Sequence, residues 1–182
     1  MMSAIRFLKI FMRQPKINAS MIPSSKRAAQ GMVNGLDLKA MKYVVELGPG
    51  TGVMTNILAE HLPSDCKVLL IELEKEFIAP LKKKYDNRFE VVNCSASSLK
   101  DLLEERNVSQ VDLIISGLPF TLPEEVKKPL YSALQELTEG GTCMRWFTYF
   151  PFLMKKHYKQ FPFKKSCFVG WNFPPMWIYT VN

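Results

Sequence analysis

Cysteine and histidine are scarce in this chain, and their placement argues against two kinds of site. The 182 residues include 4 cysteines and 2 histidines. No cysteine pair has the close spacing of a zinc site, and no cluster of histidines accompanies them. Four cysteines spread along the chain do not indicate a disulfide framework either. We therefore expect no metal ion and a reducing compartment.

Long hydrophobic runs are also lacking. No apolar segment approaches the length of a membrane-spanning helix. The amino-terminal stretch is apolar, but Arg6, Lys9 and Arg13 interrupt it, which is not the pattern of a secretory signal peptide. With 47% hydrophobic residues, the chain is long enough to bury a core. We expect one cytoplasmic domain over residues 1–182, with residues 1–40 as an amphipathic, helical extension.

Acidic residues are nearly absent from both ends of the chain. Residues 1–45 hold eight Lys or Arg and one acidic residue, and residues 140–182 hold six basic residues and none acidic. The segment 46–139 holds ten basic and sixteen acidic residues. Basic ends around an acidic centre favour contact with a polyanion, either an anionic membrane surface or nucleic acid. A basic surface that serves only solubility is the alternative.

Glycine is sparse as well, yet three of the 9 glycines alternate within the segment Glu46–Gly52, ELGPGTG. An apolar run precedes this segment and a helix-like run follows it, so the order is strand, glycine turn, helix. Glycine tolerates positive φ and lets a ligand lie on backbone amides. The G-x-G-x-x-G register of a dinucleotide loop fails, because Val53 stands in place of its third glycine. An acidic residue beside such a loop favours a ligand that carries a cation.

Apolar runs alternate with turn signals in an order that predicts a parallel α/β sheet. The predicted strands are Tyr43–Leu47, Lys67–Glu72, Phe89–Asn93, Val111–Ser116, Thr142–Thr148, Lys165–Trp171 and Met176–Val181. The predicted helices between them are Gly52–Leu62, Lys75–Tyr85, Leu99–Arg106 and Glu124–Leu137. Because only residues 172–175 separate the last two strands, we expect a seven-stranded, mostly parallel sheet with a C-terminal antiparallel hairpin and helices on both faces.

Two helices are expected before the first strand. The first spans about Met2 to Arg13, with apolar residues on one face and basic residues on another. This composition is typical of a helix in a lipid headgroup layer, and packing of its apolar face on the domain core is the alternative. The second begins at Ser24 or Ser25, both good N-cap residues, and ends near Gly35.

The pattern E-x-G-x-G-x-G after a first strand resembles the cofactor loop of class I S-adenosylmethionine-dependent methyltransferases. The resemblance implies a Rossmann-like fold, S-adenosylmethionine as cofactor and S-adenosylhomocysteine as product. It implies that Glu46 faces the amino and sulfonium end of the cofactor. The loop residues expected around the cofactor are Gly48, Pro49, Gly50, Thr51 and Gly52. An ordinary glycine-rich turn is the alternative interpretation.

Two more strand ends match the family's cofactor motifs. Glu72 ends the second predicted strand, where the family has an acid for the ribose hydroxyls, and Leu73 follows as a wall for the adenine. Alternatively, Glu72 is only a surface acid at a strand end. After the third strand, Ser95 takes the place of the family's adenine-binding acid, with Ala96 beside it. A neutral hydroxyl bonds more weakly than a carboxylate, so we expect a modest cofactor affinity.

The segment Ser116–Phe120, SGLPF, ends the fourth predicted strand, where the resemblance places the methyl acceptor. Methyltransferases that act on amino nitrogens often have a Pro–aromatic loop here, and the adenine-specific ones begin it with Asn or Asp. This chain has Gly117, which offers backbone carbonyls but no side-chain acceptor. Phe120 can stabilise a sulfonium or a methylated ammonium by cation–π contact, or it packs in the core. The candidate catalytic residues are Gly117, Leu118, Pro119, Phe120 and Tyr149.

Four stretches in order along the chain resemble bacterial phospholipid N-methyltransferases in particular. They are residues 11–16 leading into 21–25, the glycine loop, the SGLPF segment, and 147–149 joined to 172–175. The resemblance implies N-methylation of phosphatidylethanolamine and adds Ser24 and Ser25 as cofactor contacts. Tyr149 and His157 are candidates for proton or headgroup contacts, although His157 beside several lysines is also typical of a surface histidine.

The same resemblance implies peripheral association with the inner membrane. The expected contacts with its anionic surface are the N-terminal helix and the basic carboxyl-terminal tail. A helix near Phe152–Gln160 is expected over the mouth of the active site. An RNA adenine N6-methyltransferase is the alternative enzyme, and Gly117 argues against it, so a nucleic-acid partner is not expected. A non-catalytic lipid-binding or RNA-binding module, made conceivable by Ser95, is the remaining alternative.

Overall fold

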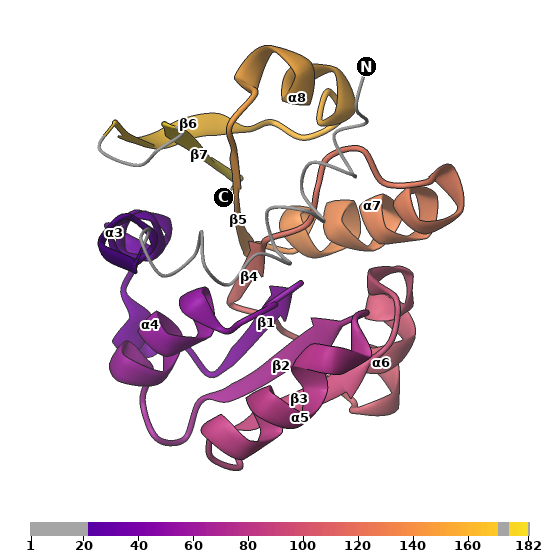
Figure 1. The fold of residues 1–182 in the computed structure, drawn as a ribbon. Helices are drawn as coiled ribbons and strands as arrows, with labels where there is room; N and C mark the ends of the chain where they lie inside the picture. The colour runs from indigo at the N-terminus through magenta and orange to yellow at the C-terminus, as the bar shows by residue number, and fades with distance from the viewer. Residues whose placement is uncertain (1–21, 171–174, 182) are drawn as a thin grey trace.

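The computed structural model describes residues 22–170 and 175–181, with side chains from residue 26 onward. Seven strands form one sheet in the order β3-β2-β1-β4-β5-β7-β6 (Figure 1). The strands are β1 (Tyr43–Leu47), β2 (Lys67–Glu72), β3 (Phe89–Asn93), β4 (Leu113–Ser116), β5 (Cys143–Thr148), β6 (Lys164–Val169) and β7 (Met176–Val181). β1 to β5 pair in parallel, whereas β7 is antiparallel to both β5 and β6. The predicted fold class and terminal hairpin are confirmed.

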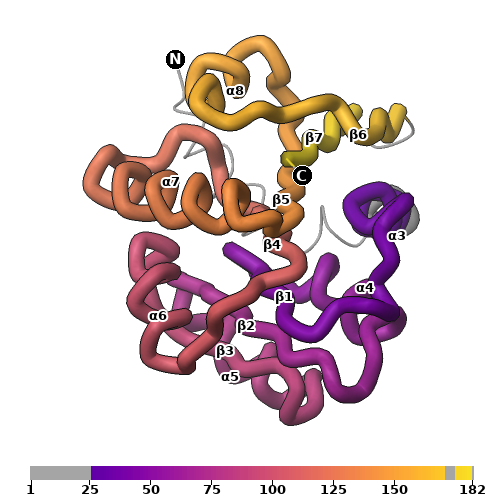
Figure 2. The backbone as a smooth tube through the Cα atoms, turned by 180° about the vertical axis from the view of Figure 1, so that it is seen from behind, coloured from indigo at the N-terminus to yellow at the C-terminus, as the bar shows by residue number. Residues whose placement is uncertain are grey.

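Helices cover both faces of this sheet, as predicted. They are α3 (Ile22–Val33), α4 (Val53–His61), α5 (Lys75–Lys84), α6 (Leu99–Glu105), α7 (Glu124–Glu139) and α8 (Pro151–His157), with short 3-10 turns η1 (Leu38–Ala40) and η2 (Ala96–Ser98). α3 and α4 lie on one side of the sheet, and α6 and α7 lie on the other (Figures 1 and 2). Among the described helices, none is long and apolar enough to span a bilayer.

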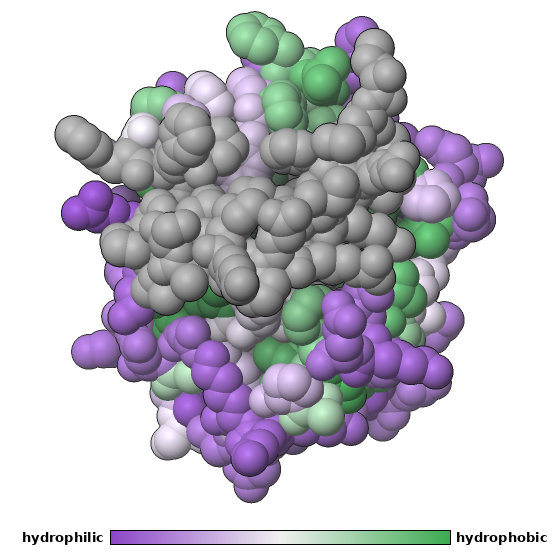
Figure 3. Space-filling model, in the orientation of Figure 1, coloured by the Kyte–Doolittle hydropathy of each residue, from purple (hydrophilic) through white to green (hydrophobic). Residues whose placement is uncertain are grey.

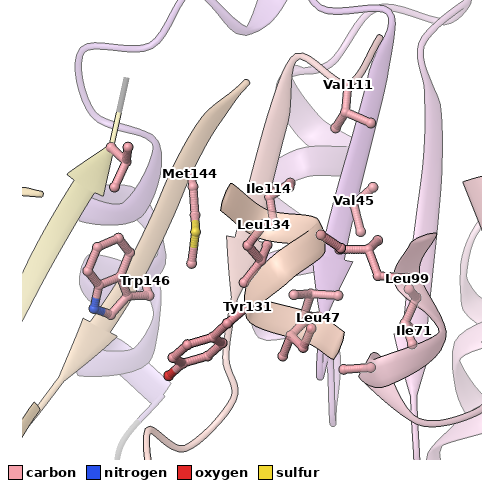
Figure 4. Packing of buried hydrophobic residues seen from close by; sticks show 14 of the residues in the cluster. Val45, Leu47, Ile71, Leu99, Val111, Ile114, Tyr131, Leu134, Met144 and Trp146 are labelled. Carbon is pink, nitrogen blue, oxygen red and sulfur yellow. The ribbon is translucent and has the colours of Figure 1, made fainter. Parts of the chain in front are cut away.

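The central strands are buried on both faces, which explains their continuous apolar runs. Val45 and Leu47 of β1 point into the cluster beneath α6 and α7, together with Ile114 of β4 (Figure 4). Val44 points into the opposite cluster, beneath α3, α4 and α5. Since side chains alternate along a strand, Glu46 shares the face of Val44. The pleat therefore directs this acid toward α4.

Several boundaries differ from the predicted ones. α3 begins at Ile22, so Ser24 and Ser25 lie inside its first turn, and the prediction that one of them caps the helix is wrong. The proline between Ile22 and Ser24 is compatible with a first turn, because its missing N–H needs no helical partner there. α8 spans Pro151–His157 rather than residues 152–160, and it also has a proline in its first turn. The helix predicted near Met2–Arg13 lies outside the described residues.

The carboxylate of Asp112, just before β4, fixes the entry of β1 into the sheet. Its Oδ2 accepts hydrogen bonds from the backbone N–H of Lys42, at 2.7 Å, and of Tyr43, at 2.9 Å. β1 and β4 then pair in parallel from Val44 and Leu113 onward. One side chain thus holds in register the two strands whose opposite ends carry the candidate site.

Replacing Asp112 with Ala should destabilise the fold. Two backbone N–H groups lose their acceptor, so we expect the free energy of unfolding to fall by about 1–3 kcal/mol in urea titrations. Asp112→Asn keeps one acceptor oxygen and should lose less. Equal losses in the two variants would show that the side-chain oxygen does not organise the entry to β1.

Candidate active site

The glycine loop after β1 requires its glycines for two separate reasons. Gly48, Gly50 and Gly52 have φ of 71°, 55° and 80°, which L side chains rarely adopt. Space is short as well, because a Cβ on Gly48 would lie 3.0 Å from the Leu118 side chain, and one on Gly52 would collide with the hydroxyl of Tyr85. The alternating glycines seen in the sequence therefore build a tight turn packed from both sides.

Glu46 lies under this loop as a buried acid, only 2% exposed. Its Oε2 accepts a hydrogen bond from Thr55 Oγ1 of α4 at 2.8 Å. Burial raises the pKa of Glu46 to about 7, the Thr55 hydrogen bond opposes the rise, and the nearby Glu72 adds to it. Within the described residues no cationic side chain pairs with Glu46. A buried carboxyl group of this kind suits an incoming positive charge.

Glu72 ties the glycine loop to the end of β2. Its Oε2 accepts a hydrogen bond from Gly50 N and its Oε1 accepts one from Glu74 N, both at 2.8 Å. Asn93, at the end of β3, donates from Nδ2 to the backbone carbonyls of Glu72 and Leu73 at 2.9 Å. The ends of β1, β2 and β3 therefore form one hydrogen-bonded edge, with both predicted cofactor acids on it.

Ser95 is engaged with its own turn. Its Oγ accepts hydrogen bonds from Ser97 N at 3.3 Å and from Ser97 Oγ at 2.8 Å, and it caps η2. The Ser95 hydroxyl proton is the part left for a ligand. Ala96 is buried, while Leu73 is 65% exposed and offers an apolar surface at the same edge. Their adenine contacts remain predictions.

Residues 117–120 follow β4 where the methyl acceptor is predicted, and we call them the acceptor loop. This loop lies directly on the glycine loop. Gly117 N donates to Leu47 O at 2.8 Å, and a Cβ on Gly117 would lie 2.9 Å from Gly48 O. Leu118 N lies 3.3 Å from Ser116 Oγ, which accepts its hydrogen bond. The structure thus brings Gly117 and Leu118, predicted from the sequence, against the predicted cofactor loop.

The aromatic candidates have different neighbours. The ring of Phe120 lies 5.3 Å from the imidazole of His157, the last residue of α8. Phe120 packs on the cluster beneath α6 and α7. Tyr149 packs on the opposite cluster, with its ring 5.7 Å from Phe147. Burial and the charge of Lys127 lower the pKa of His157, which favours a neutral imidazole beside Phe120. The catalytic roles of Phe120, Pro119 and Tyr149 remain predictions.

Two residues of the site were not predicted. Thr55 holds Glu46, and Tyr85 Oη lies 2.8 Å from Gly52 O and 2.9 Å from Asn56 Oδ1. Thr55 lies inside α4 and Tyr85 directly follows α5, and no local signal marks either position. Only the register of α4 and α5 against the sheet brings them to the loop. Ser24 and Ser25 have no described side chains, and their cofactor contacts remain predictions.

Comparisons with known proteins identify the class of site. A family model described as ribosomal RNA adenine dimethylase matches residues 19–133. An ornithine lipid N-methyltransferase from Singulisphaera acidiphila is 30% identical over 178 residues, 95% of this chain and 92% of that protein. A ribosomal RNA small subunit methyltransferase A from Hydrogenobaculum sp. is 36% identical over 98 residues, 54% of this chain and 36% of that protein.

Solved structures share the fold. A dimethyladenosine transferase from Plasmodium falciparum aligns with a TM-score of 0.57 and 19% identity over 85% of this chain and 60% of its own. Aeropyrum pernix fibrillarin, solved with natively bound S-adenosylmethionine, aligns with a TM-score of 0.61 and 10% identity over 87% of this chain and 73% of its own. The match to a methyltransferase family supports S-adenosylmethionine as the cofactor, as predicted.

Gly117→Ala should impair methyl transfer. The added methyl group would force the acceptor loop away from Gly48 O, and small misplacements of reacting groups are costly. We expect kcat to fall about tenfold or more, measured as methyl transfer from S-adenosylmethionine. Gly140→Ala, after α7, is the matched control. The Cβ added there would lie 3.3 Å from its nearest atom, Leu137 O, which is a tight contact but not the 2.9 Å collision expected at Gly117. Full activity in Gly117→Ala would mean that the close approach is not needed.

Glu46 should make cofactor binding depend on pH. With its pKa at about 7, the carboxylate forms as pH rises through that value, so S-adenosylmethionine should bind more tightly above it. This pKa lies above the ordinary value of about 4.3, so the folded chain keeps the Glu46 proton up to a higher pH than the unfolded chain does. Stability of the cofactor-free protein should therefore fall from about pH 4.3 to about pH 7.

Glu46→Gln should abolish both trends and weaken binding above neutral pH. Calorimetry of cofactor binding and urea titrations across this pH range would measure them. Glu60→Gln, an exposed acid on the same helix as Thr55, is the control and should behave as the unmodified protein. If Glu46→Gln kept the original pH profile, another group would be responsible.

Proposed function

This chain belongs to the ribosomal RNA adenine dimethylase family of class I S-adenosylmethionine-dependent methyltransferases, and we propose that it methylates the primary amine of a membrane lipid headgroup. Phosphatidylethanolamine is the acceptor predicted from the sequence. The observation that carries the proposal is the match to a lipid N-methyltransferase over 92% of that protein's length. By contrast, the chain spans 36% of the ribosomal RNA methyltransferase from Hydrogenobaculum sp..

The acceptor loop supports a lipid amine over an adenine base. Adenine-specific relatives are expected to have Asn or Asp at the position of Gly117. Here any side chain would meet Gly48 O, so the loop has no room for such an acceptor. Backbone carbonyls of residues 117–119 would instead accept hydrogen bonds from the N–H groups of a small, flexible amine. A headgroup amine on a lipid fits this requirement.

The chain's own residues have to align the amine and exclude water. S-adenosylmethionine supplies an activated methyl group on a sulfonium. Glu46 and the glycine loop would hold the charged end of the cofactor, and Glu72 would face its ribose. Phe120 would stabilise the cationic nitrogen through its ring face, and Tyr149 would contact the headgroup. The amine must be neutral to attack, so its proton has to leave before transfer.

An RNA adenine N6-methyltransferase is the second candidate. The family model and the Hydrogenobaculum relative favour it, because both are described by their action on ribosomal RNA. The match to the latter covers 54% of this chain. Membership of the family therefore specifies the cofactor and leaves two acceptor classes to be separated by experiment.

Transfer of labelled methyl groups should separate these acceptors. We expect label in vesicles that contain phosphatidylethanolamine, and ornithine lipid vesicles test the alternative lipid amine. Phosphatidylcholine vesicles, whose nitrogen is already fully methylated, are the control and should stay unlabelled. Ribosomal RNA should also stay unlabelled. Label in RNA and none in either aminolipid would overturn the proposal.

A further inference from the structure

The most exposed apolar side chains around α8 form a group at its start. Phe152 is 84% exposed, Leu153 53% and Phe150 46%. In the rest of the described chain, only Leu73 and Phe168 are large hydrophobic residues with comparable exposure. Figure 3 shows hydrophobic surface at the top of the molecule, where Figure 1 places α8. Three apolar side chains within four residues are therefore exposed at the start of α8, and we call them the apolar patch.

This exposure does not result from loose packing of the helix. Met154, Tyr158 and Phe161 are buried in the cluster beneath α8. Tyr158 stacks on Trp146 with ring centroids 4.6 Å apart and an interplanar angle of 10°. α8 is therefore anchored on one side while its apolar residues on the other side face solvent.

The charged residues that follow the patch along the chain all have one sign. Lys155, Lys156 and Lys159 are exposed beside it, and Lys164 and Lys165 are exposed at the start of β6. Residues 140–182 contain no acidic residue. Apolar side chains bordered by lysines are complementary to a surface with anionic headgroups over hydrocarbon.

We propose that Phe150, Phe152, Leu153 and the three lysines Lys155, Lys156 and Lys159 form a docking surface for an anionic lipid bilayer. The apolar residues enter the boundary between headgroups and acyl chains, and the lysines meet lipid phosphates. This inference rests on the proposed lipid substrate. It names the element that presents the site to the membrane.

The position of α8 connects this docking surface to the acceptor loop. α8 begins three residues after β5, at the sheet edge where β1 and β4 also end. Its last residue, His157, contacts the ring of Phe120 at 5.3 Å. One short helix therefore joins the proposed docking surface, at its start, to a contact with the loop after β4, at its end.

Vesicle sedimentation tests the docking surface without any substrate amine. The probe is vesicles of phosphatidylcholine and phosphatidylglycerol in equal parts. Phe152→Ser combined with Leu153→Ser should weaken binding by about tenfold or more, with unchanged thermal unfolding because both side chains are exposed. Binding by this variant equal to that of the unmodified protein would overturn the proposal.

Replacing lysines with glutamate tests whether vesicle binding requires the positive charge of α8. Each lysine near an anionic surface contributes about fivefold to binding, so Lys155→Glu with Lys156→Glu should weaken it by more than about twentyfold. Lys82→Glu with Lys83→Glu changes the net charge equally but lies on α5, away from α8 (Figures 1 and 2). An equal loss in this control would show that only the net charge matters and would contradict the assigned surface.

A soluble substrate separates docking from chemistry. The variant with Phe152→Ser and Leu153→Ser should methylate short-chain phosphatidylethanolamine, supplied below its critical micelle concentration, as fast as the unmodified protein does. It should lose methylation of phosphatidylethanolamine in vesicles. If the unmodified protein methylated neither form, the proposed function would fail, whereas vesicle binding would still decide the docking surface. If the serine variant lost both activities, α8 would act on the chemistry, and docking would not explain its role.

Discussion

The approach of Gly117 to the carbonyl of Gly48 is the constraint on which the site depends. It places the loop after β4 directly on the loop after β1, with no side chain between Gly117 and Gly48. β1 and β4 are neighbours because the strand order reverses there, and open α/β sheets bind ligands at such a point. The two loops thus meet through the backbone of Gly117 and the side chain of Leu118, which brings the predicted cofactor and acceptor positions together.

Two buried acids complete this arrangement in different ways. Glu72 accepts one backbone N–H on each carboxylate oxygen, which fixes the side chain and shapes the loop while both oxygens keep a lone pair for a further hydrogen bond. Among the described residues, Glu46 accepts a hydrogen bond from the hydroxyl of Thr55, and burial raises its pKa to about 7. The site therefore has one acid held by backbone N–H groups and one that gains from a cationic ligand.

Local pattern was sufficient for the parallel half of the fold. β1, β2 and β3 have the predicted bounds, because continuous apolar runs between turn signals identify buried strands. The glycine loop, Glu46 and Glu72 were also identified, since they lie at or directly after the carboxyl end of a predicted strand. Long-range packing could not be predicted: the insertion of β7 between β5 and β6, the hydrogen bond from Thr55 and the contact of His157 with Phe120 all depend on register between distant segments. The N-cap prediction at Ser24 and Ser25 relied on the local preference of serine, whereas the helix already begins at Ile22.

The insertion of β7 between β5 and β6 has a consequence for biosynthesis. Residues 176–181 are translated after both of their partners, so one edge of β5 and the whole of β6 stay unpaired while the chain emerges from the ribosome. Unpaired strand edges invite intermolecular pairing. β6 begins with two exposed lysines, Lys164 and Lys165, and charges on an edge strand oppose pairing with another chain.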